Sequence, residues 1–488
     1  MSRSKKSVIS AFYLILDSVF QKLIGLVSTL ILARILVPDD FGIIAIAALA
    51  YGFIEVFSQT GSNQYVISRQ TIDDDLVNSA WTLDVMVKLV VFVLMQMAAL
   101  PVSEYYDNPE IEALFRAYPV LLLLGAFTSP SIWLLIRDQN LKRYFTMQVV
   151  AKIFSVIVTV SIALIYRSYW ALIIGQIVST TLKMGLSYMI HPYRPRLCFR
   201  GMKAQLSFSA YMIPQELFGY IKANIDSFFI SRNYSENAFG NFHIMKYISF
   251  LPSMNIIGPI TQPLLTEVAK DHQDETQRVY NYSITFLIVL LIATPIALFC
   301  ILNSQLMLLV LLGEQWLTYH AIFASLSVLI ITLFMVNHAK RALIASSKTN
   351  LIFVYEGITA SLVAGSIFLN LDNDLVTLIQ WRTLTEVITA AMFLFFTTWF
   401  YLGADSGYFW RKQSFALLGM MLLGLSTWKI QQLHWFDTLP NVLHLAMEGV
   451  VFGLCYLIII TVLYYIYYYK TDEGQHIFRL LNIRKLLA

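Results

Sequence analysis

The chain has 488 residues, of which 58% are hydrophobic and only 13% are charged. Soluble domains are about 45–50% apolar and about 25% charged, so this composition excludes an ordinary soluble domain and favours a chain surrounded by lipid. The net charge of +4 is too small to suggest a nucleic-acid partner, and the three cysteines form no CxxC pair. We therefore predict neither a disulfide framework nor a metal site.

Long apolar segments recur along the whole chain. About 20 apolar residues in a helix cross a bilayer core of about 30 Å, and backbone groups in lipid must be paired within the segment. We therefore predict an all-α integral membrane protein with about fourteen transmembrane helices. These lie near residues 10–35, 41–60, 79–100, 113–136, 146–166, 169–190, 207–231, 240–267, 280–303, 317–341, 351–369, 374–401, 412–432 and 444–469.

The sequence at one boundary between apolar segments is repeated later in the chain. In "ILARILVPDDFG", Arg34 precedes Gly42 by eight positions, and in "FISRNYSENAFG", Arg232 precedes Gly240 by eight, both pairs displaced by 198 residues. Six segments separate the copies, so both halves enter the membrane in the same direction, as a parallel repeat about an axis along the membrane normal. The alternative is that Arg at a helix end and Gly at a helix start are common interfacial choices. We interpret both arginines as structural, since a cation in the last turn complements the helix dipole.

The repeat predicts a domain organisation. Residues 1–193 would form an N-terminal lobe of six helices, and residues 194–403 a C-terminal lobe of six. Residues 404–488 would contribute two further helices and a cytoplasmic tail. The connection "HPYRPRLCFRGMKAQ" between the lobes carries four cations and two prolines.

Lys and Arg in the connections predict the orientation, because cytoplasmic loops of membrane proteins are enriched in these residues. With the N-terminus inside, 22 cations fall on the cytoplasmic side. Five fall outside, namely Arg34, Arg116, Arg167, Arg232 and Lys429. An even number of helices then places both termini in the cytoplasm.

Charged residues within the segments are candidate site residues, because an ionisable group at the bilayer centre costs several kcal/mol. Three oppositely charged pairs stand four residues apart and so share a helical face, where structural pairing is the alternative to a site. These pairs are Asp84 with Lys88, Lys222 with Asp226, and Arg382 with Glu386.

Other charges lack such a neighbour. Lys22 and Asp17 are five apart, a poor spacing for pairing within one helix, so we expect their partners across a cavity. Glu55 lies deep in the second segment, and an unpaired carboxylate there would suit coupling to H⁺ or Na⁺. The alternative is that Glu55 pairs with Lys22 or Lys88.

Four stretches in order carry a family resemblance. They are "LARILVPDDFG", "YIKANIDSFFISRNYSENAFGNFHIMKYISFLP", "PITQPLLTEVAK" and "LLGEQW". They resemble the polysaccharide transporter family of the multidrug/oligosaccharidyl-lipid/polysaccharide exporter superfamily, and "RPRLCF" is similar to colanic-acid-exporter-type flippases. The chain departs from the family at Lys246, where a small or apolar residue is more usual.

The resemblance implies a flippase and not an enzyme. Such proteins move an undecaprenyl-pyrophosphate-linked oligosaccharide from the cytoplasmic to the periplasmic leaflet of the bacterial inner membrane, for exopolysaccharide, capsule or O-antigen synthesis. It implies no cofactor, while coupling to H⁺ or Na⁺ stays open. A polysaccharide polymerase and a chain-length regulator would be partners.

The substrate that the resemblance implies assigns roles to the charged residues. We expect Lys22 and Lys222 to hold the pyrophosphate in a central cavity, with Lys22 ranked first. Further cavity cations would be Lys88, Lys246 and Arg382, and the cavity carboxylates Asp17, Glu55 and Asp226.

Two other functions remain as alternatives. A drug or cation antiporter of the same superfamily would need isolated carboxylates in its cavity, whereas the five cavity cations favour an anionic lipid. A membrane polysaccharide polymerase or ligase would need a large outer loop, and every predicted outer connection is short.

Overall fold

The fold is known from a computed structural model, which describes residues 3–69, 71–258 and 275–467. Secondary structure in these ranges is helical, as predicted. The chain divides into two compact units, Met1–His243 and Ile244–Ala488. The stretch "PITQPLLTEVAK" and the predicted cytoplasmic tail beyond residue 467 lie outside the described residues.

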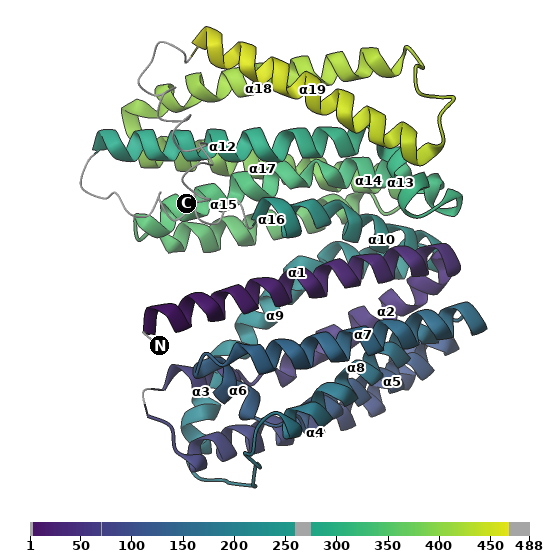
Figure 1. The fold of residues 1–488 in the computed structure, drawn as a ribbon, viewed down its shortest axis with the longest axis vertical. Coiled ribbons are helices and arrows are strands. Elements are labelled where there is room, and N and C mark those ends of the chain that lie inside the picture. Colours follow the sequence, from purple (N-terminus) through teal and green to yellow (C-terminus); the bar gives the residue numbers. More distant parts are fainter. Residues whose placement is uncertain (1–2, 70, 259–274, 468–488) are drawn as a thin grey trace. The chain divides into compact units, whose positions relative to one another are not determined.

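The first unit contains the helices up to the start of α10 (Figure 1). They are α1 (Arg3–Ile35), α2 (Pro38–Glu55), η1 (Val56–Ser58), α3 (Ser62–Ser68), α4 (Asp74–Tyr105), α5 (Pro109–Ala126), α6 (Ser131–Arg137), α7 (Leu141–Tyr166), α8 (Trp170–Met189), α9 (Met202–Asn233) and α10 (Glu236–Pro252), which crosses into the second unit. α4 packs along α5, α7 packs along both α1 and α8, and α5 also contacts α2 and α8.

Capping residues explain where several of these helices begin. Asp73 accepts a hydrogen bond from the backbone N–H of Leu76 (2.8 Å) and so caps α4, while Asn108 caps α5 through the N–H of Glu110 (2.8 Å). Pro38 and Pro109 stand at first helical positions, where their missing N–H costs nothing. The acidic run that starts at Asp73 is therefore the start of a helix.

The second unit contains the helices that follow α10 (Figure 1), and its described residues form more than one buried apolar cluster. Its helices are η2 (Ser253–Ile257), α12 (Glu275–Leu302), α13 (Ser304–Leu311), η3 (Glu314–Tyr319), α14 (His320–Ser327), α15 (Leu329–Ala345), α16 (Thr349–Leu369), α17 (Leu375–Leu402), η4 (Gly403–Asp405), α18 (Ser406–Gln431) and α19 (Asn441–Tyr467). Phe409 of α18 and Tyr282 of α12 are fully buried. α18 therefore belongs to the core of this unit, and α19 packs on it from outside.

By the length and composition of the described helices, fewer segments qualify as membrane spans than the sequence predicted. Nine stretches are long and apolar enough to cross a bilayer, or ten if α5 and α6, bent by 63°, form one span. The fourteen spans predicted from the sequence are therefore not confirmed. The differences have a physical cause: α8 and α9 are long enough but carry more polar side chains, and α17 to α18 counts as one continuous stretch.

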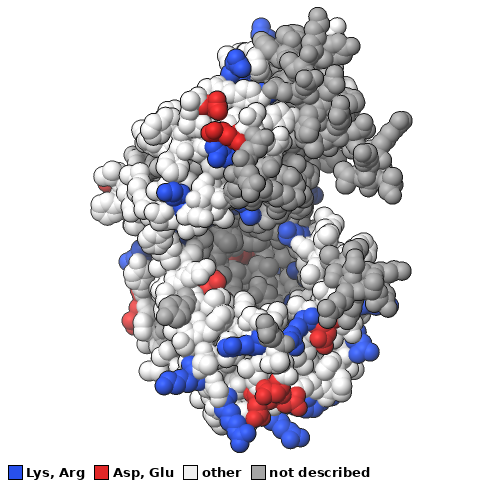
Figure 2. All heavy atoms as spheres, turned by 90° about the vertical axis from the view of Figure 1, so that its left-hand side faces the viewer, with Lys and Arg blue, Asp and Glu red and all other residues white. Residues whose placement is uncertain are grey.

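One end of the first unit collects basic side chains that the sequence assigned to the cytoplasm. Arg137 donates to the carbonyl of Arg69 (3.0 Å), and Arg143 donates to the carbonyl of Ile190 (3.0 Å). Arg200 forms an ion pair with Asp75 (3.3 Å). Figure 2 shows Lys and Arg side chains around an acidic group at this end. The opposite end carries Arg34 and Arg232, each in the last turn of its helix.

Helices α2 and α10 meet within the first unit through their repeated glycines. A β carbon on Gly42 would overlap the carbonyl oxygen of Glu236, and a β carbon on Gly240 would overlap that of Pro38. Asn237 Nδ2 donates to Asp39 Oδ2 at 2.8 Å. The two glycine contacts are reciprocal, because adding 198 to residue numbers 38 and 42 gives 236 and 240. The Asp39–Asn237 bond joins residues that are themselves 198 positions apart, the displacement that relates the two sequence motifs.

Candidate functional site

Two broken helices define a polar cavity in the first unit. α2 ends at Glu55, continues as η1, and resumes as α3 after Gly61, whose φ of +65° lies in the left-handed region that favours glycine. A β carbon there would lie 3.0 Å from the Phe208 ring of α9. The second break bends α5 against α6 by 63°. Broken helices line the substrate sites of many transporters, because their free backbone groups can face a ligand.

The cavity has a volume of about 530 Å³ and a largely polar wall. Its residues come from both broken helices and from α4 and α8. The polar and aromatic members are Tyr51, Glu55, Ser58, Gln59, Thr60, Ser62, Asn63, Gln64, Asp84, Lys88, Thr128, Ser129, Trp133 and Thr180. With two carboxylates and one ammonium group, the wall is close to neutral.

Asp84, one of the lining residues, is the centre of a polar network. Its Oδ2 pairs with Lys88 Nζ at 2.7 Å, and its Oδ1 accepts from Thr60 Oγ1 at 2.9 Å. Thr60 Oγ1 also lies 2.8 Å from Ser62 Oγ, which accepts from Gln205 Nε2 of α9 at 2.6 Å. These bonds hold the break between η1 and α3 against α4 and α9.

Glu55 faces the same cavity with different neighbours. The Tyr51 hydroxyl hydrogen-bonds its carboxylate, and Lys88 lies near enough for electrostatic attraction. Because the Lys88 ammonium contacts Asp84, the pairing of Glu55 with Lys88 that the sequence left open is at most indirect. Tyr51 itself stacks on Tyr118, with ring centroids 5.1 Å apart.

The cavity contains only some of the residues that the sequence predicted as site residues. Glu55 and Lys88 line the cavity, while Asp17, Lys22, Lys222 and Asp226 belong to the same unit but are not part of this wall. Lys22 is exposed on α1, and Lys222 is half-buried on α9. Asp226 is 1% exposed and accepts from the N–H of Ser227 (2.8 Å). Their assignment to a substrate site stays a prediction.

Two nominated cations lie in the second unit. Arg382 is buried on α17 and pairs with Glu386 at 2.6 Å, as the four-residue spacing predicted. Lys246 is half-buried on the second half of α10. Their role in substrate binding also stays a prediction.

Sequence reasoning missed most of the uncharged cavity wall. The sequence analysis did not identify four lining residues as site candidates, namely Thr60, Asn63, Trp133 and Thr180. Asn63 Oδ1 is buried and has no hydrogen-bond partner among the described residues. A signal was present: the stretch "SQTGSNQ", residues 58–64, is polar throughout and follows a strongly apolar segment. Such a stretch with a central glycine indicates a broken membrane helix.

Curated relatives share about a fifth of their residues with this chain. The succinoglycan biosynthesis transport protein ExoT of Rhizobium meliloti is 22% identical over 59% of this chain and 58% of its own length. The lipopolysaccharide biosynthesis protein WzxC of Escherichia coli is 21% identical over 65% of each chain, and the teichuronic acid biosynthesis protein TuaB of Bacillus subtilis 19% identical over 67% and 69%. The chain thus spans about three fifths to two thirds of the length of these relatives.

Solved structures of two transporter classes share the fold. The lipid II flippase MurJ in an inward closed conformation aligns with a TM-score of 0.69 and 13% identity, over 92% of this chain and 98% of its own. An inward-facing multidrug resistance MATE family transporter aligns with a TM-score of 0.58 and 12% identity, over 79% and 97%. The fold is therefore that of the superfamily that the sequence predicted.

The family model described as "Polysaccharide biosynthesis protein" matches residues 31–321, more than half of the chain. This match agrees with the transporter fold and with the membrane-spanning helices of both units. The protein is a multi-pass membrane protein, and it belongs to the Wzx-like polysaccharide biosynthesis family, a family of transporters and not of enzymes.

Proposed function

We propose that this protein moves undecaprenyl-pyrophosphate-linked oligosaccharides from the cytoplasmic to the periplasmic leaflet of a bacterial inner membrane. The observation that carries the proposal is the polar cavity between two broken helices in a chain of the polysaccharide biosynthesis family. A glycan presents many hydroxyl groups, each a donor and an acceptor, and the cavity wall offers amides, hydroxyls and carboxylates that match them. The product would supply exopolysaccharide, capsule or O-antigen synthesis.

The near-neutral wall suits the sugar part of the substrate better than its pyrophosphate. A polyanionic group needs cations, and the one ammonium group in the wall, on Lys88, is already paired with Asp84. We propose that the pyrophosphate instead binds Lys22 and Lys222, on the first helix of each repeat. Lys246 and Arg382 are further candidates in the second unit.

Transport would proceed by alternating access between two repeats. The reciprocal contact of Gly42 with Gly240 and the bond of Asp39 to Asn237 support a pseudo-two-fold axis between α2 and α10. Contacts between equivalent residues are the signature of two-fold symmetry. We propose that residues 1–193 and 194–403 form the two lobes, and that residues 404–488 add two helices and a tail. The chain would then have fourteen spans, with both termini in the cytoplasm. A polymerase and a chain-length regulator would receive the product.

Coupling to H⁺ or Na⁺ would involve a cavity carboxylate. Glu55 is the first candidate because it lines the cavity, where its carboxylate hydrogen-bonds the Tyr51 hydroxyl and is attracted by Lys88. Asp17 and Asp226 lie elsewhere in the first unit and are second candidates.

A cation or drug antiporter is the second candidate function. The MATE-like fold and the two cavity carboxylates, Glu55 and Asp84, favour it. The two functions differ in their substrates, since an antiporter would protect cells from cationic drugs and leave polysaccharide export unchanged.

Complementation tests the proposal directly. In a strain that lacks its own oligosaccharide flippase but makes the matching repeat unit, the wild-type chain should restore polysaccharide export. Asn63→Ala and Trp133→Ala should reduce export at normal protein level, because both side chains line the cavity. Asn233→Ala is the matched control, since its side chain only bonds the Phe229 carbonyl of its own helix (2.8 Å). Drug resistance without export would favour the antiporter.

A further inference from the structure

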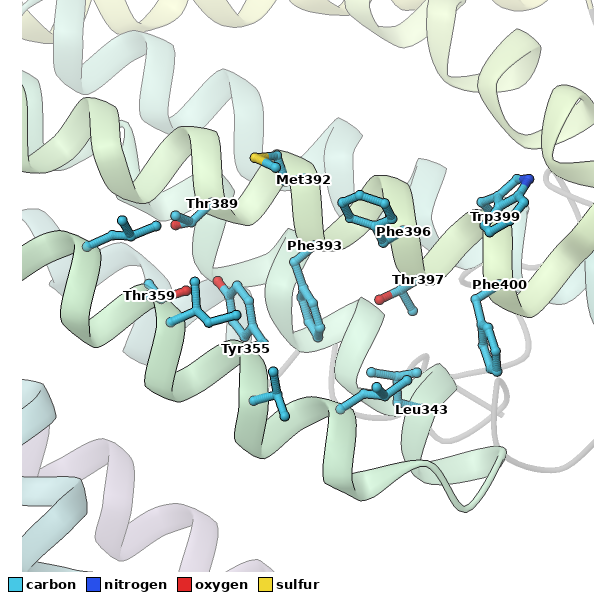
Figure 3. Close-up of a pocket in the computed structure, with 14 residues that line it drawn as sticks. Leu343, Tyr355, Thr359, Thr389, Met392, Phe393, Phe396, Thr397, Trp399 and Phe400 are labelled. Atoms are coloured by element: carbon cyan, nitrogen blue, oxygen red, sulfur yellow. The ribbon is translucent and has the colours of Figure 1, made fainter.

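An apolar groove runs along the second unit between α16 and α17. Its volume is about 370 Å³. Figure 3 shows Leu343 of α15 and Phe400 at one end and Thr359 and Thr389 at the other. Between these ends the walls are almost entirely apolar, with Val354, Ile358, Leu362, Met392, Phe396 and Phe400 among the lining residues. Several of these side chains are more than half exposed, so the groove opens towards the surroundings of the helices, where a membrane protein meets lipid.

The length of the groove matches one leaflet of a bilayer. Its wall on α16 extends from Leu351 to Leu362, and its wall on α17 extends from Thr389 to Phe400. At 1.5 Å of rise per residue, each wall is about 16 Å long. Half of a hydrocarbon core of about 30 Å is about 15 Å. The groove therefore accommodates one extended acyl chain from the headgroup region to the bilayer centre.

A cation stands at the end of the groove where a headgroup would lie. Lys348 is exposed, and its Nζ lies 5.7 Å from the centroid of the Phe400 ring, which lines the groove. Lys340, nearby in sequence, is already paired with Glu356. α16 begins at Thr349, directly after Lys348, with neither a side-chain cap nor an acidic residue in its first turn. The N–H groups of such a helix start add to the attraction that Lys348 exerts on a phosphate.

From the leaflet length, the apolar walls and the cation at one end, we propose that this groove binds one anionic phospholipid, with an acyl chain along α16 and α17 and the phosphate on Lys348. An undecaprenyl chain is less suited, because a chain of many isoprene units is longer than a groove one leaflet deep. The bound lipid packs against both helices, so it stabilises the second unit. This site is independent of the polar cavity and of the transported substrate.

Native mass spectrometry of the full-length protein, purified in a mild detergent and supplied with phosphatidylglycerol or phosphatidylcholine, tests the site. The wild-type chain should retain one phosphatidylglycerol and prefer it to phosphatidylcholine. Lys348→Gln should reduce this preference about fivefold, the worth of one cation near a charged lipid surface. Ile358→Trp should fill the groove and abolish retention of both lipids.

Matched variants separate this site from general effects of charge and bulk. Lys142→Gln removes an exposed cation from the first unit, and Phe353→Trp enlarges an exposed side chain of α16 outside the groove. Both should behave like the wild type. Equal lipid retention by wild type and Ile358→Trp would overturn the proposal, as would an unchanged preference in Lys348→Gln. Retention of added undecaprenyl phosphate in place of phosphatidylglycerol would overturn the choice of occupant.

Discussion

At the scale of single residues, charged groups within membrane helices are either paired or candidates for function. Asp84 with Lys88 and Arg382 with Glu386 form the pairs that their four-residue spacing predicted. Pairing on one helical face lowers the cost of carrying charge into lipid. These pairs therefore need no substrate to explain them, whereas Lys22 lies exposed on α1 and is a candidate for function.

We expect Lys22→Ala and Lys222→Ala, expressed at normal levels, to reduce polysaccharide export sharply. Each lysine would give a pyrophosphate a charge-assisted hydrogen bond worth about 1.5–3 kcal/mol, so its loss should weaken binding roughly tenfold or more. Complementation of a flippase-deficient strain measures export. Lys→Arg at either position should retain part of the activity, because the charge is kept. Wild-type export by both alanine variants would return these lysines to a structural role.

At the scale of helices, the sequence predicted the long apolar elements well and the breaks poorly. Lipid requires about 20 apolar residues per helix, and the segments read at 10–35, 146–166 and 351–369 correspond to α1, α7 and α16. The cavity was missed because it depends on where a helix stops. Gly61 adopts a left-handed conformation between η1 and α3, and hydrophobic periodicity does not record such a break. Thr180 enters the wall from a helix distant in sequence, which only packing can determine.

The crossing of α2 and α10 gives a prediction for two glycines. Gly42→Ala and Gly240→Ala should each destabilise the protein by about 1–3 kcal/mol, because the new methyl group would overlap a backbone carbonyl that cannot rotate away. Thermal unfolding in detergent measures the loss. Gly219→Ala in α9 is the control, since a β carbon there meets nothing within 4 Å. The losses should be similar at both sites, and a large loss at one with none at the other would contradict the reciprocal contact.

The start of α17 gives a prediction that depends on pH. Asp374 accepts hydrogen bonds from Thr377 Oγ1 (2.6 Å) and from the Thr377 N–H (3.1 Å). Bonds from Thr377 hold the pKa of Asp374 below its ordinary value. A carboxylate with a lowered pKa in the folded state stabilises the protein above the unfolded pKa of about 3.9, and this is lost as the pH falls through the folded value.

Asp374→Ala should therefore lower the melting temperature at pH 7, and the difference from wild type should shrink as the pH falls below about 4. Thermal unfolding across a pH series measures this difference. Asp372→Ala, two residues earlier and exposed, is the control and should show little effect. A difference from wild type that stays constant across the series would show that the charge of Asp374 does not contribute.

At the scale of the whole molecule, the number of spans and the orientation are linked. The sequence predicts fourteen spans with 22 loop cations inside and 5 outside, while nine or ten described stretches pass a test of length and composition. The two counts differ at α8 and α9, whose polar residues would be tolerated if they face a cavity and not lipid. They also differ at α10, whose described helix has 17 residues, and at α17 and α18, which count as one stretch. Accessibility of loop residues from the two sides of the membrane distinguishes the counts.

We expect single cysteines at Ser168, Asp372 and Asp437 to react with a membrane-impermeant maleimide in intact cells, in a chain whose three native cysteines are replaced by serine. Cysteines at Gln139 and Ser347 should react only after permeabilisation. With fourteen spans, the chain crosses the membrane five times between Ser168 and Ser347, so the two residues lie on opposite sides. If only Glu275–Leu302 and Glu314–Ala345 cross in this interval, the two residues lie on the same side. Two crossings likewise return the chain to the outside between Asp372 and Asp437, whereas a single crossing by Leu375–Gln431 would not. Labelling of the Ser168 and Ser347 positions from the same side would therefore reject the fourteen-span topology.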